Sequence, residues 1–372
     1  MPKSKLLCIL HRSPPAHGAA KVGDFIVSSQ KLQENFECRL ISIKSSETIG
    51  DIGKVNLKKF YLVAELYVKV LWALLTFRPD KIYFTASIRS VALYRDLLVS
   101  TLWKSYRLFK KVDIYYHYHT KGVDDFVSSS ERNLKLTRFF VKDVNLVLLS
   151  PLLEKDFDKL KSYNSISFLP NGIEDPFEGE AFDAFVQEKF ESVKRVEVLY
   201  MAHMMKEKGY DEVLELARQS KEENVHYHFA GSWQNSEDEK YFRDFVKAHD
   251  LDKHVTYHGF VSGEQKKILF KQAHMLAYPS KNDAFPLTLL ESLSYGVPVI
   301  ATNEGSIPYI LDEKSGMILE TVDSLVETFE SAKEKLINQE TAMYCRERYL
   351  EHFSLAQFEE NLVNIVMEKR SV

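Results

Sequence analysis

The sequence predicts an α/β protein of two domains, each built on a parallel sheet covered by helices. Three observations support this. A chain of 372 residues exceeds one ordinary hydrophobic core. Its 45% hydrophobic and 27% charged residues are typical of a folded chain. Short apolar runs alternate with helical segments along the sequence, as in parallel sheets that are buried on both faces.

The first half contains six short apolar runs that we interpret as strands, with room for helices between them. These runs are Lys5–Leu10, Arg39–Ile43, Lys81–Thr85, Val112–Tyr118, Asn145–Leu149 and Ile166–Leu169. The longest apolar segment, Phe60–Phe77, includes Glu65 and Lys69. It therefore predicts an amphipathic buried helix and not a membrane span.

The second half shows a cleaner alternation, with helical spacing over Asp211–Glu223 and Glu264–Gln272. Its expected strands are Val196–Met201, Val225–Ala230, His254–His258, Met275–Tyr278 and Val297–Ala301. Residues 170–194 are broken by prolines and glycines, which indicates the interdomain connection. We expect an N-terminal domain over residues 1–169 and a C-terminal domain over residues 170–352.

The net charge of −4 conceals an asymmetry. Residues 1–150 hold 24 Lys and Arg against 13 Asp and Glu, a balance of +11, and the rest holds 25 against 40, a balance of −15. The basic half includes Trp103–Arg107, taken as exposed, and Lys110–Lys111, a combination that suits anionic lipid headgroups or a lipid-diphosphate acceptor. A solvated basic face without a partner is an equal alternative, and no nucleic-acid module is present.

The three cysteines, Cys8, Cys38 and Cys345, are too few and too widely spaced for a disulfide framework or a zinc site. His11 and Arg12 interrupt the first apolar run before it could form a signal-peptide core. The expected location is cytoplasmic, at the inner face of the membrane if the basic half binds lipid.

One loop follows the first expected strand and precedes a helix. Arg12–Ala20 contains small residues whose backbone N–H groups can approach a phosphate closely. It lacks both G-x-G-x-x-G and G-x-x-x-x-G-K-[ST], which argues against a dinucleotide site or a P-loop.

The stretch Ser280–Ile300 is the most informative. Pro286 suits the first turn of a helix, whose free N–H groups attract anions, and Gly296 suits its end. Asp283 lies at the mouth of that helix and Glu291 further along it. Two carboxylates around an anion-binding helix start could hold the hydroxyls of a sugar nucleotide on either side of its diphosphate. The plain alternative is that Asp283 is a helix cap.

These segments resemble the retaining family 4 glycosyltransferases of the GT-B fold, the glycosyl transferases group 1. Ser280–Ile300 is similar to their E-x7-E region, with Asp283 and Glu291 in the acidic positions. Met201–Gly209 is similar to the segment with the diphosphate-binding lysine, here Lys208.

The resemblance extends over nearly the whole chain. Tyr118–Gly122 is similar to the loop whose histidine, here His119, faces the reacting sugar, and Gly18 matches the glycine-rich loop. Further similar segments are the crossover turn at Leu169–Glu174, the strand and turn at Val255–Val261, and the terminal helix at Phe353–Glu368. The last implies that residues 353–372 cross back to the first domain.

The resemblance implies two Rossmann-like domains whose parallel sheets face an interdomain cleft. It also implies roles for individual residues: catalysis by His119 and Asp283, binding of the donor diphosphate by Gly18, His203, Lys208, Phe285 and Leu287, and binding of the nucleoside by Val261 and Glu291. Two positions depart from the family, Asp283 for the first glutamate and His203 for the usual arginine. We expect these changes to affect sugar preference and donor affinity.

The implied activity is transfer of a hexose-type sugar from a nucleoside-diphosphate sugar to a glycan or lipid-linked acceptor, with retention, in surface polysaccharide or glycolipid synthesis. We expect no metal and no cofactor, because the D-x-D pairs at Asp156–Asp158 and Asp250–Asp252 fit solvated charge better than a metal site. His226 and His228 lie two apart on a strand without an obvious third ligand, so we expect structural roles for both.

Other interpretations stay open. A catalytically weak GT-B-like binding or scaffold subunit would share the whole pattern, and a GT-B phosphorylase or epimerase would share most of it. A nicotinamide-dependent oxidoreductase would need a glycine fingerprint that this sequence lacks. Taken singly, Lys208 could be a solvated charge and His119 a hydrogen-bonded core histidine.

Overall fold

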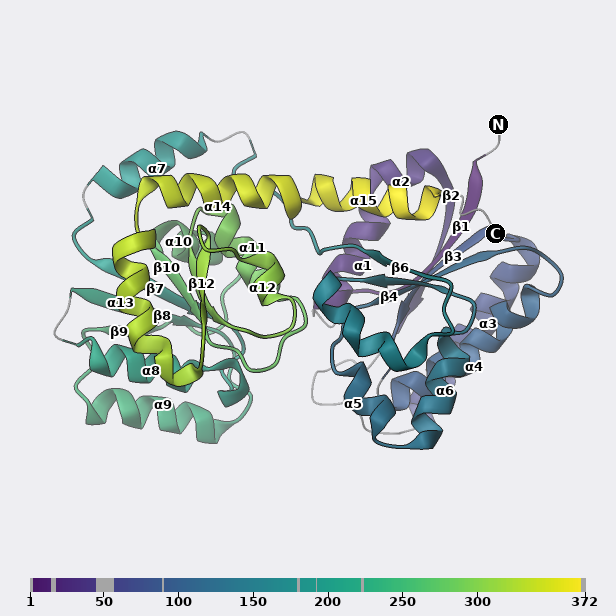
Figure 1. Cartoon of the computed structure of the whole chain (residues 1–372), viewed down its shortest axis with the longest axis horizontal. Coiled ribbons are helices and arrows are strands. Elements are labelled where there is room, and N and C mark those ends of the chain that lie inside the picture. Colours follow the sequence, from purple (N-terminus) through teal and green to yellow (C-terminus); the bar gives the residue numbers. More distant parts are fainter. Residues whose placement is uncertain are drawn as a thin grey trace. The chain divides into compact units, whose positions relative to one another are not determined.

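The computed structural model describes residues 3–14, 18–44, 57–88, 90–178, 181–191, 193–221 and 224–368. The chain divides into two compact units (Figure 1). The first unit comprises Met1–Asn171 together with Leu355–Val372, and the second comprises Gly172–Ser354. The sequence-based boundaries lie at residues 169 and 352, and the last segment returns to the first unit.

The first unit contains a six-stranded parallel sheet in the order β2-β1-β3-β4-β5-β6. All six expected strands are present. Their bounds are β1 Ser4–His11, β2 Phe36–Ile43, β3 Lys81–Ala86, β4 Asp113–Tyr118, β5 Asn145–Leu148 and β6 Ser165–Phe168.

Helices cover both faces of this first sheet. On one face, the helices and the sheet enclose a core that includes Trp103 and Tyr116. The other face is covered by α1, α2 and α15, the last helix of the chain. The bounds are α1 Gly18–Ser28, α2 Gln30–Asn35, α3 Leu57–Thr76, α4 Ser90–Tyr106, α5 Val123–Ser128, α6 Glu131–Val141, the 3-10 helix Pro151–Leu160 and α15 Leu355–Met367.

One expectation for the first unit is wrong, and another is met only in part. Trp103 is fully buried and its indole Nε1–H donates to the Tyr116 hydroxyl over 2.9 Å, so it is not an exposed aromatic residue. The segment Phe60–Phe77 does form a helix, α3, but the face of α3 opposite the core is exposed and not buried. Among the described residues, no helix is both long and apolar enough to cross a membrane.

The second unit contains another six-stranded parallel sheet, in the order β12-β11-β10-β7-β8-β9. Five of its strands are those expected, and β12 is an edge strand that the sequence pattern did not reveal. The bounds are β7 Val196–Met201, β8 Val225–Ala230, β9 Val255–Tyr257, β10 Met275–Tyr278, β11 Val299–Thr302 and β12 Gly316–Leu319. The order reverses between β7 and β10. The carboxyl ends of these two adjacent strands form the switch point of the sheet, which is where open parallel sheets bind ligands.

The helices of the second unit include α8, α9 and α13 around one core. The bounds are α7 Phe182–Glu191, α8 Tyr210–Gln219, α9 Ser236–Ala248, α10 Gly263–Gln272, α11 Leu287–Ser294, α12 Ile307–Ile310, α13 Leu325–Leu336 and α14 Gln339–His352, with short 3-10 turns at Lys206–Lys208 and Val322–Ser324.

The first and last residues of the second unit are held together. The Ile173 backbone N–H donates to the Phe353 carbonyl over 3.0 Å, and the Tyr349 hydroxyl donates to the Ile173 carbonyl over 3.0 Å. Arg346 is buried, and one of its nitrogens bonds both carboxylate oxygens of Asp175 at 2.7 Å. The guanidinium also donates to the Ser294 carbonyl at the end of α11. This cation therefore joins the interdomain connection to α11 and α14.

We predict that Arg346→Ala lowers the free energy of unfolding of the second unit by about 3 kcal/mol, because it leaves a carboxylate and a carbonyl without their buried partner. Arg346→Lys should restore only part of the loss, since an ammonium group cannot reproduce the planar fork. Urea unfolding of the full chain, followed by circular dichroism, measures the change. Arg243→Ala is the control: Arg243 pairs with Glu239 on the surface, and its loss should cost less than about 1 kcal/mol. An unchanged urea midpoint for Arg346→Ala would contradict the prediction.

Candidate functional site

The switch point in the second sheet brings Lys208 and Asp283 together. Lys208 lies in the short turn after β7, and Asp283 lies in the loop after β10. The Lys208 ammonium is 2.7 Å from Asp283 Oδ2 and donates to the Asn282 carbonyl over 2.6 Å. An ammonium group has three hydrogens, so one remains for a ligand.

The Asp283 carboxylate is held by three donors at one oxygen. Besides Lys208, Oδ2 accepts from the Tyr278 hydroxyl at 2.8 Å and the Ser280 hydroxyl at 2.6 Å. Burial, with the nearby Asp283 charge, holds the pKa of Tyr278 well above its ordinary value, so the phenol stays a donor. Asp283 does not cap α11, whose N-cap position is Pro286.

Two glycines allow the loops of this site to approach one another. Gly209 has a φ of +80°, and a Cβ there would lie 2.6 Å from the Pro279 carbonyl oxygen. Gly305, after β11, has a φ of +54°, and a Cβ there would lie 2.1 Å from the Asp283 carbonyl oxygen. Two backbone hydrogen bonds, each 2.8 Å long, also join these loops. The Lys281 N–H donates to the Glu207 carbonyl, and the Ser306 N–H donates to the Ala284 carbonyl. Any side chain at either glycine would push the loops apart.

Glu291 pairs with Lys266, a residue that the sequence did not indicate. Glu291 projects from α11, and its Oε1 is 2.6 Å from the Lys266 ammonium on α10. Val261 is half-buried in the loop that precedes α10. Lys266 stands next to Lys267 in an ordinary polar helix, so nothing in the local sequence distinguishes it from a solvated lysine.

The start of α11 combines buried side chains with uncapped N–H groups. Phe285 is buried, and its ring centroid is 6.2 Å from that of Phe353. Leu287 is half-buried and is the first residue of the helix. The side chain of the N-cap residue, Pro286, makes no capping hydrogen bond. The first N–H groups of α11 therefore present a partial positive charge.

His203 has an exposed side chain just beyond β7. Its carbonyl accepts from the Met205 N–H at 2.9 Å and the Tyr200 hydroxyl at 3.3 Å. The backbone is therefore held in place while the imidazole is open to solvent.

Two adjacent carboxylates, Asp211 and Glu212, lie in the first turn of α8. Burial, together with the adjacent Glu212 carboxylate, raises the pKa of Asp211 to about 7. Glu212 also forms an ion pair with Lys281, from the same loop as Asp283. Sequence reasoning did not single out this pair, because acidic residues are common in the first turn of a helix.

Two expected site residues lie in the first unit. His119 is half-buried just after β4, with its ring centroid 4.0 Å from that of His117. His117 is the core histidine here: it is fully buried, its Nδ1 is 2.8 Å from the Tyr83 hydroxyl, and burial holds its pKa well below the ordinary value. Gly18 begins α1, and a Cβ there would meet nothing within 4 Å. The expected phosphate loop falls partly outside the described residues, at positions 15–17.

The acidic pairs and paired histidines have mostly structural contacts. Asp156 accepts the backbone N–H groups of Gly122 and Val123 at 2.5 and 3.2 Å, so it holds the start of α5 and is not simply solvated. His226 contacts Lys253 O and Thr256, and His228 bridges His258 and Glu197. Within the described ranges, no group of three or more His, Cys, Asp or Glu is arranged to hold a metal ion.

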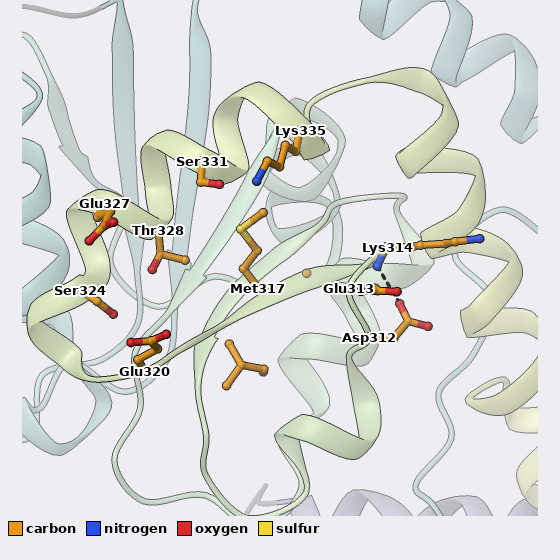
Figure 2. Close-up of a pocket in the computed structure, with 12 residues that line it drawn as sticks. Asp312, Glu313, Lys314, Met317, Glu320, Ser324, Glu327, Thr328, Ser331 and Lys335 are labelled. Atoms are coloured by element: carbon orange, nitrogen blue, oxygen red, sulfur yellow. Dashed lines mark hydrogen bonds between the residues drawn. The ribbon is translucent and has the colours of Figure 1, made fainter.

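A separate open cavity of about 840 Å³ lies between β12 and α13 (Figure 2). Its lining includes Glu320, Glu327 and Lys335, and none of the expected site residues. The chemistry predicted from the sequence therefore does not lie in this cavity.

The fold is that of the GT-B glycosyltransferases. A glycosyltransferase from Rickettsia africae superposes with a TM-score of 0.72 over 99% of this chain and 100% of that one, at 14% identity. Anabaena HepE, solved with UDP and glucose, superposes with a TM-score of 0.68 over 97% and 99%, also at 14% identity.

Residues 182–351 match the family described as Glycosyl transferases group 1. The sequence is 26% identical over 140 residues to the putative colanic acid biosynthesis glycosyltransferase WcaL of Escherichia coli. This alignment covers 35% of the chain and 33% of WcaL. The sequence is also 28% identical over 155 residues to the Alpha-1,3/1,6-mannosyltransferase ALG2 of Dictyostelium discoideum. This second alignment covers 39% of the chain and 36% of ALG2. The aligned region thus spans well under half the length of either relative.

We predict that Asp211→Asn stabilises the chain more at pH 8 than at pH 5. The raised pKa means that the folded state holds the proton more tightly than the unfolded state. This group's contribution to stability is therefore present at acid pH and is lost as the pH rises from about 4 towards 7. Melting temperatures across this range measure the effect. Asp244→Asn, at an exposed position, is the control and should follow the parental pH profile. A pH-independent effect of Asp211→Asn would contradict the prediction.

Proposed function

We propose that this protein is a glycosyltransferase that moves a hexose-type sugar from a nucleoside-diphosphate sugar to a glycan or lipid-linked acceptor, with retention of configuration. The observation that supports the proposal best is the contact between Lys208 and Asp283 beside the start of α11. It places a cation, a carboxylate and free helix N–H groups at the carboxyl ends of adjacent parallel strands. A diphosphate and an attached sugar need this combination of partners.

The donor diphosphate binds Lys208 and the N-terminus of α11. The remaining ammonium hydrogen and the helix dipole both favour a phosphate oxygen. We assign Phe285 and Leu287, at the start of α11, and the exposed His203 to the same diphosphate-binding surface. Glu291 and Val261 receive the nucleoside, with Lys266 holding the glutamate in place.

Asp283 is arranged to receive the sugar. Its Oδ2 is occupied by three donors, whereas Oδ1 accepts no hydrogen bond from the described residues and can accept a sugar hydroxyl. The ion pair with Lys208 also implies competition. An incoming diphosphate shares the Lys208 ammonium with Asp283, so the Asp283 carboxylate is less fully neutralised. Its negative charge is then available when positive charge develops on the sugar.

Transfer then follows from charge stabilisation. Lys208 and α11 stabilise the departing diphosphate while an oxocarbenium-like sugar forms. The acceptor hydroxyl attacks on the face that the leaving group vacates, the new glycosidic bond replaces the bond to phosphate, and the leaving phosphate takes the acceptor proton. His119 of the first unit orients the sugar. No described side chain is required as a covalent nucleophile.

We extend the proposal to surface polysaccharide or glycolipid synthesis at the cytoplasmic face of a membrane. The names of two relatives support the transfer of sugars and, for WcaL, polysaccharide synthesis. WcaL is named for colanic acid biosynthesis, and ALG2 is named a mannosyltransferase. A thermal-shift panel of nucleoside diphosphates and their sugars tests the donor class, because selective stabilisation reports binding to the native state.

A catalytically weak GT-B-like binding or scaffold subunit is the second candidate, favoured by the departures at Asp283 and His203 from the family pattern. Donor turnover by the isolated protein distinguishes it from an active transferase.

We predict that variants of three residues affect a bound donor differently. Lys208→Met should weaken binding of the bare nucleoside diphosphate about ten- to a hundredfold, because it removes a charge-assisted bond of about 1.5 to 3 kcal/mol. Glu291→Gln should weaken nucleotide binding in the same direction. Asp283→Asn should leave binding of the bare nucleotide unchanged or slightly stronger, because Lys208 is no longer neutralised, yet lower the rate of transfer.

Calorimetry and turnover assays of the same preparations measure these effects. Lys206→Met is the matched control, since Lys206 lies in the same short turn but over the Tyr241 ring, 5.0 Å from its centroid. A folded Asp283→Asn variant that transfers sugar at the parental rate would show that the site assignment is wrong.

We also predict that donor binding does not depend on a divalent cation. Lys208 and α11 supply the positive charge, and Asp156 is engaged in holding α5. Calorimetric titration of the donor in excess EDTA is the measurement. Loss of binding that Mg²⁺ or Mn²⁺ restores would refute this.

A further inference from the structure

Helix α3 has large apolar side chains on two opposite faces. One face packs on the sheet and contributes Leu66, Val70, Ala73 and Leu74 to the core of the first unit. The other face is open. Residues 68 and 70 are separated by about 200° around a helix of 3.6 residues per turn, so the two faces point in opposite directions.

The open face forms a continuous stripe, here called the outer stripe. Its members recur at helical spacing and are exposed by 39 to 69%: Phe60, Tyr61, Val68, Leu71, Trp72 and Leu75. A helix that is apolar all round is normally buried. An exposed patch of this kind marks an interaction site.

A second apolar feature lies at one end of the stripe. Leu108 and Phe109, between α4 and β4, are 81% and 87% exposed. The neighbouring Lys110 donates to the Arg78 carbonyl over 2.5 Å and pairs with Asp80 at 2.8 Å, and both of these residues follow the end of α3. Leu108 and Phe109 therefore lie beside the C-terminal end of the stripe.

Positive charge surrounds these apolar residues. Arg78 and Lys111 are exposed, and their side chains have no ion-pair partner among the described residues. Lys44 and Lys69 share the single carboxylate of Glu65 at 3.2 and 2.5 Å, which leaves an excess of one positive charge in that group.

We propose that the outer stripe, together with Leu108 and Phe109, docks this protein on an anionic bilayer, with α3 lying in the plane of the interface. A helix with bulky apolar and aromatic side chains on one side and lysine and arginine beside them suits that position. The helix does not cross the bilayer, because neither it nor any other described helix is long and apolar enough. The first 150 residues, with their balance of +11, are attracted to acidic headgroups.

Charge argues against a second copy as the occupant. A symmetric dimer through this surface would place Arg78, Lys69 and Lys111 close to their own equivalents without added carboxylates. Anionic lipid neutralises the same cations.

The docking surface extends towards the edge of the sheet where an acceptor would bind. Because α3 connects parallel strands, its first turn lies at their carboxyl ends and its last turn at their amino ends. Phe60 and Tyr61 are therefore at the edge that receives the acceptor. This consequence rests on the proposed function; the docking itself does not.

The test is cosedimentation with vesicles of phosphatidylcholine containing phosphatidylglycerol. Replacing Trp72 and Phe109 together by serine should lower the partition coefficient at least about tenfold, because two large rings no longer enter the interface. Leu350→Ser, at a position 45% exposed on α14, is the matched control and should bind as the parent does. Arg78→Glu with Lys111→Glu should weaken binding most at low salt.

Tryptophan fluorescence distinguishes insertion from adsorption by charge alone. Trp72 is 66% exposed and Trp103 is fully buried. Adding the vesicles should shift the emission to the blue, and Trp72→Phe should keep the binding but lose most of the shift.

Three results would overturn the proposal: unchanged binding by the Trp72 and Phe109 double variant, equal binding to vesicles of phosphatidylcholine alone, or a dimer in solution that Trp72→Ser dissociates while vesicles are not bound. Donor affinity of the double variant is measured in parallel. It should equal the parental value, so failure of docking and failure of the proposed function give different results.

Discussion

The reversal of strand order between β7 and β10 is the constraint on which the candidate site depends. It makes the loops after these two strands neighbours although they are about 75 positions apart, as the contact of Lys208 with Asp283 shows. The loops can meet only where no Cβ intervenes. Gly209 and Gly305 meet this requirement, both with positive φ and both against a carbonyl oxygen of the loop after β10. The position of α11, and hence of its free N–H groups, follows from the same loop.

Electrostatics then determines what the site can do. Two ion pairs, Lys208 with Asp283 and Lys266 with Glu291, hold four charged side chains that are 13 to 30% exposed. Within each pair, the attraction between the opposite charges partly compensates both side chains for the hydration that they lose. A diphosphate brings additional negative charge to the lysine that already has a carboxylate partner, so binding redistributes charge within a preformed arrangement. Preorganisation of this kind lowers the cost of reorienting dipoles during reaction.

The charge asymmetry of the chain has a structural counterpart in the first unit. Trp103, adjacent to basic residues in the sequence, packs into the core, whereas Leu108 and Phe109 a few positions later are exposed beside Lys110 and Lys111. Apolar and basic side chains thus share one surface at the ends of α3 and α4.

Local pattern determined most of the fold. Of the twelve strands in the described part of the chain, eleven follow from short apolar runs, because the central strands of a sheet covered on both faces are apolar over most of their length. The four-residue edge strand β12, which begins at Gly316, has too little pattern to be recognised. The motifs around Lys208, Asp283 and Glu291 were visible, since their residue types and spacing lie within single segments. The residues that contact these three side chains were not visible in the sequence. Lys266, Gly305, the Asp211–Glu212 pair and the burial of Trp103 depend on what lies across a contact from a distant part of the chain, and only tertiary packing decides that.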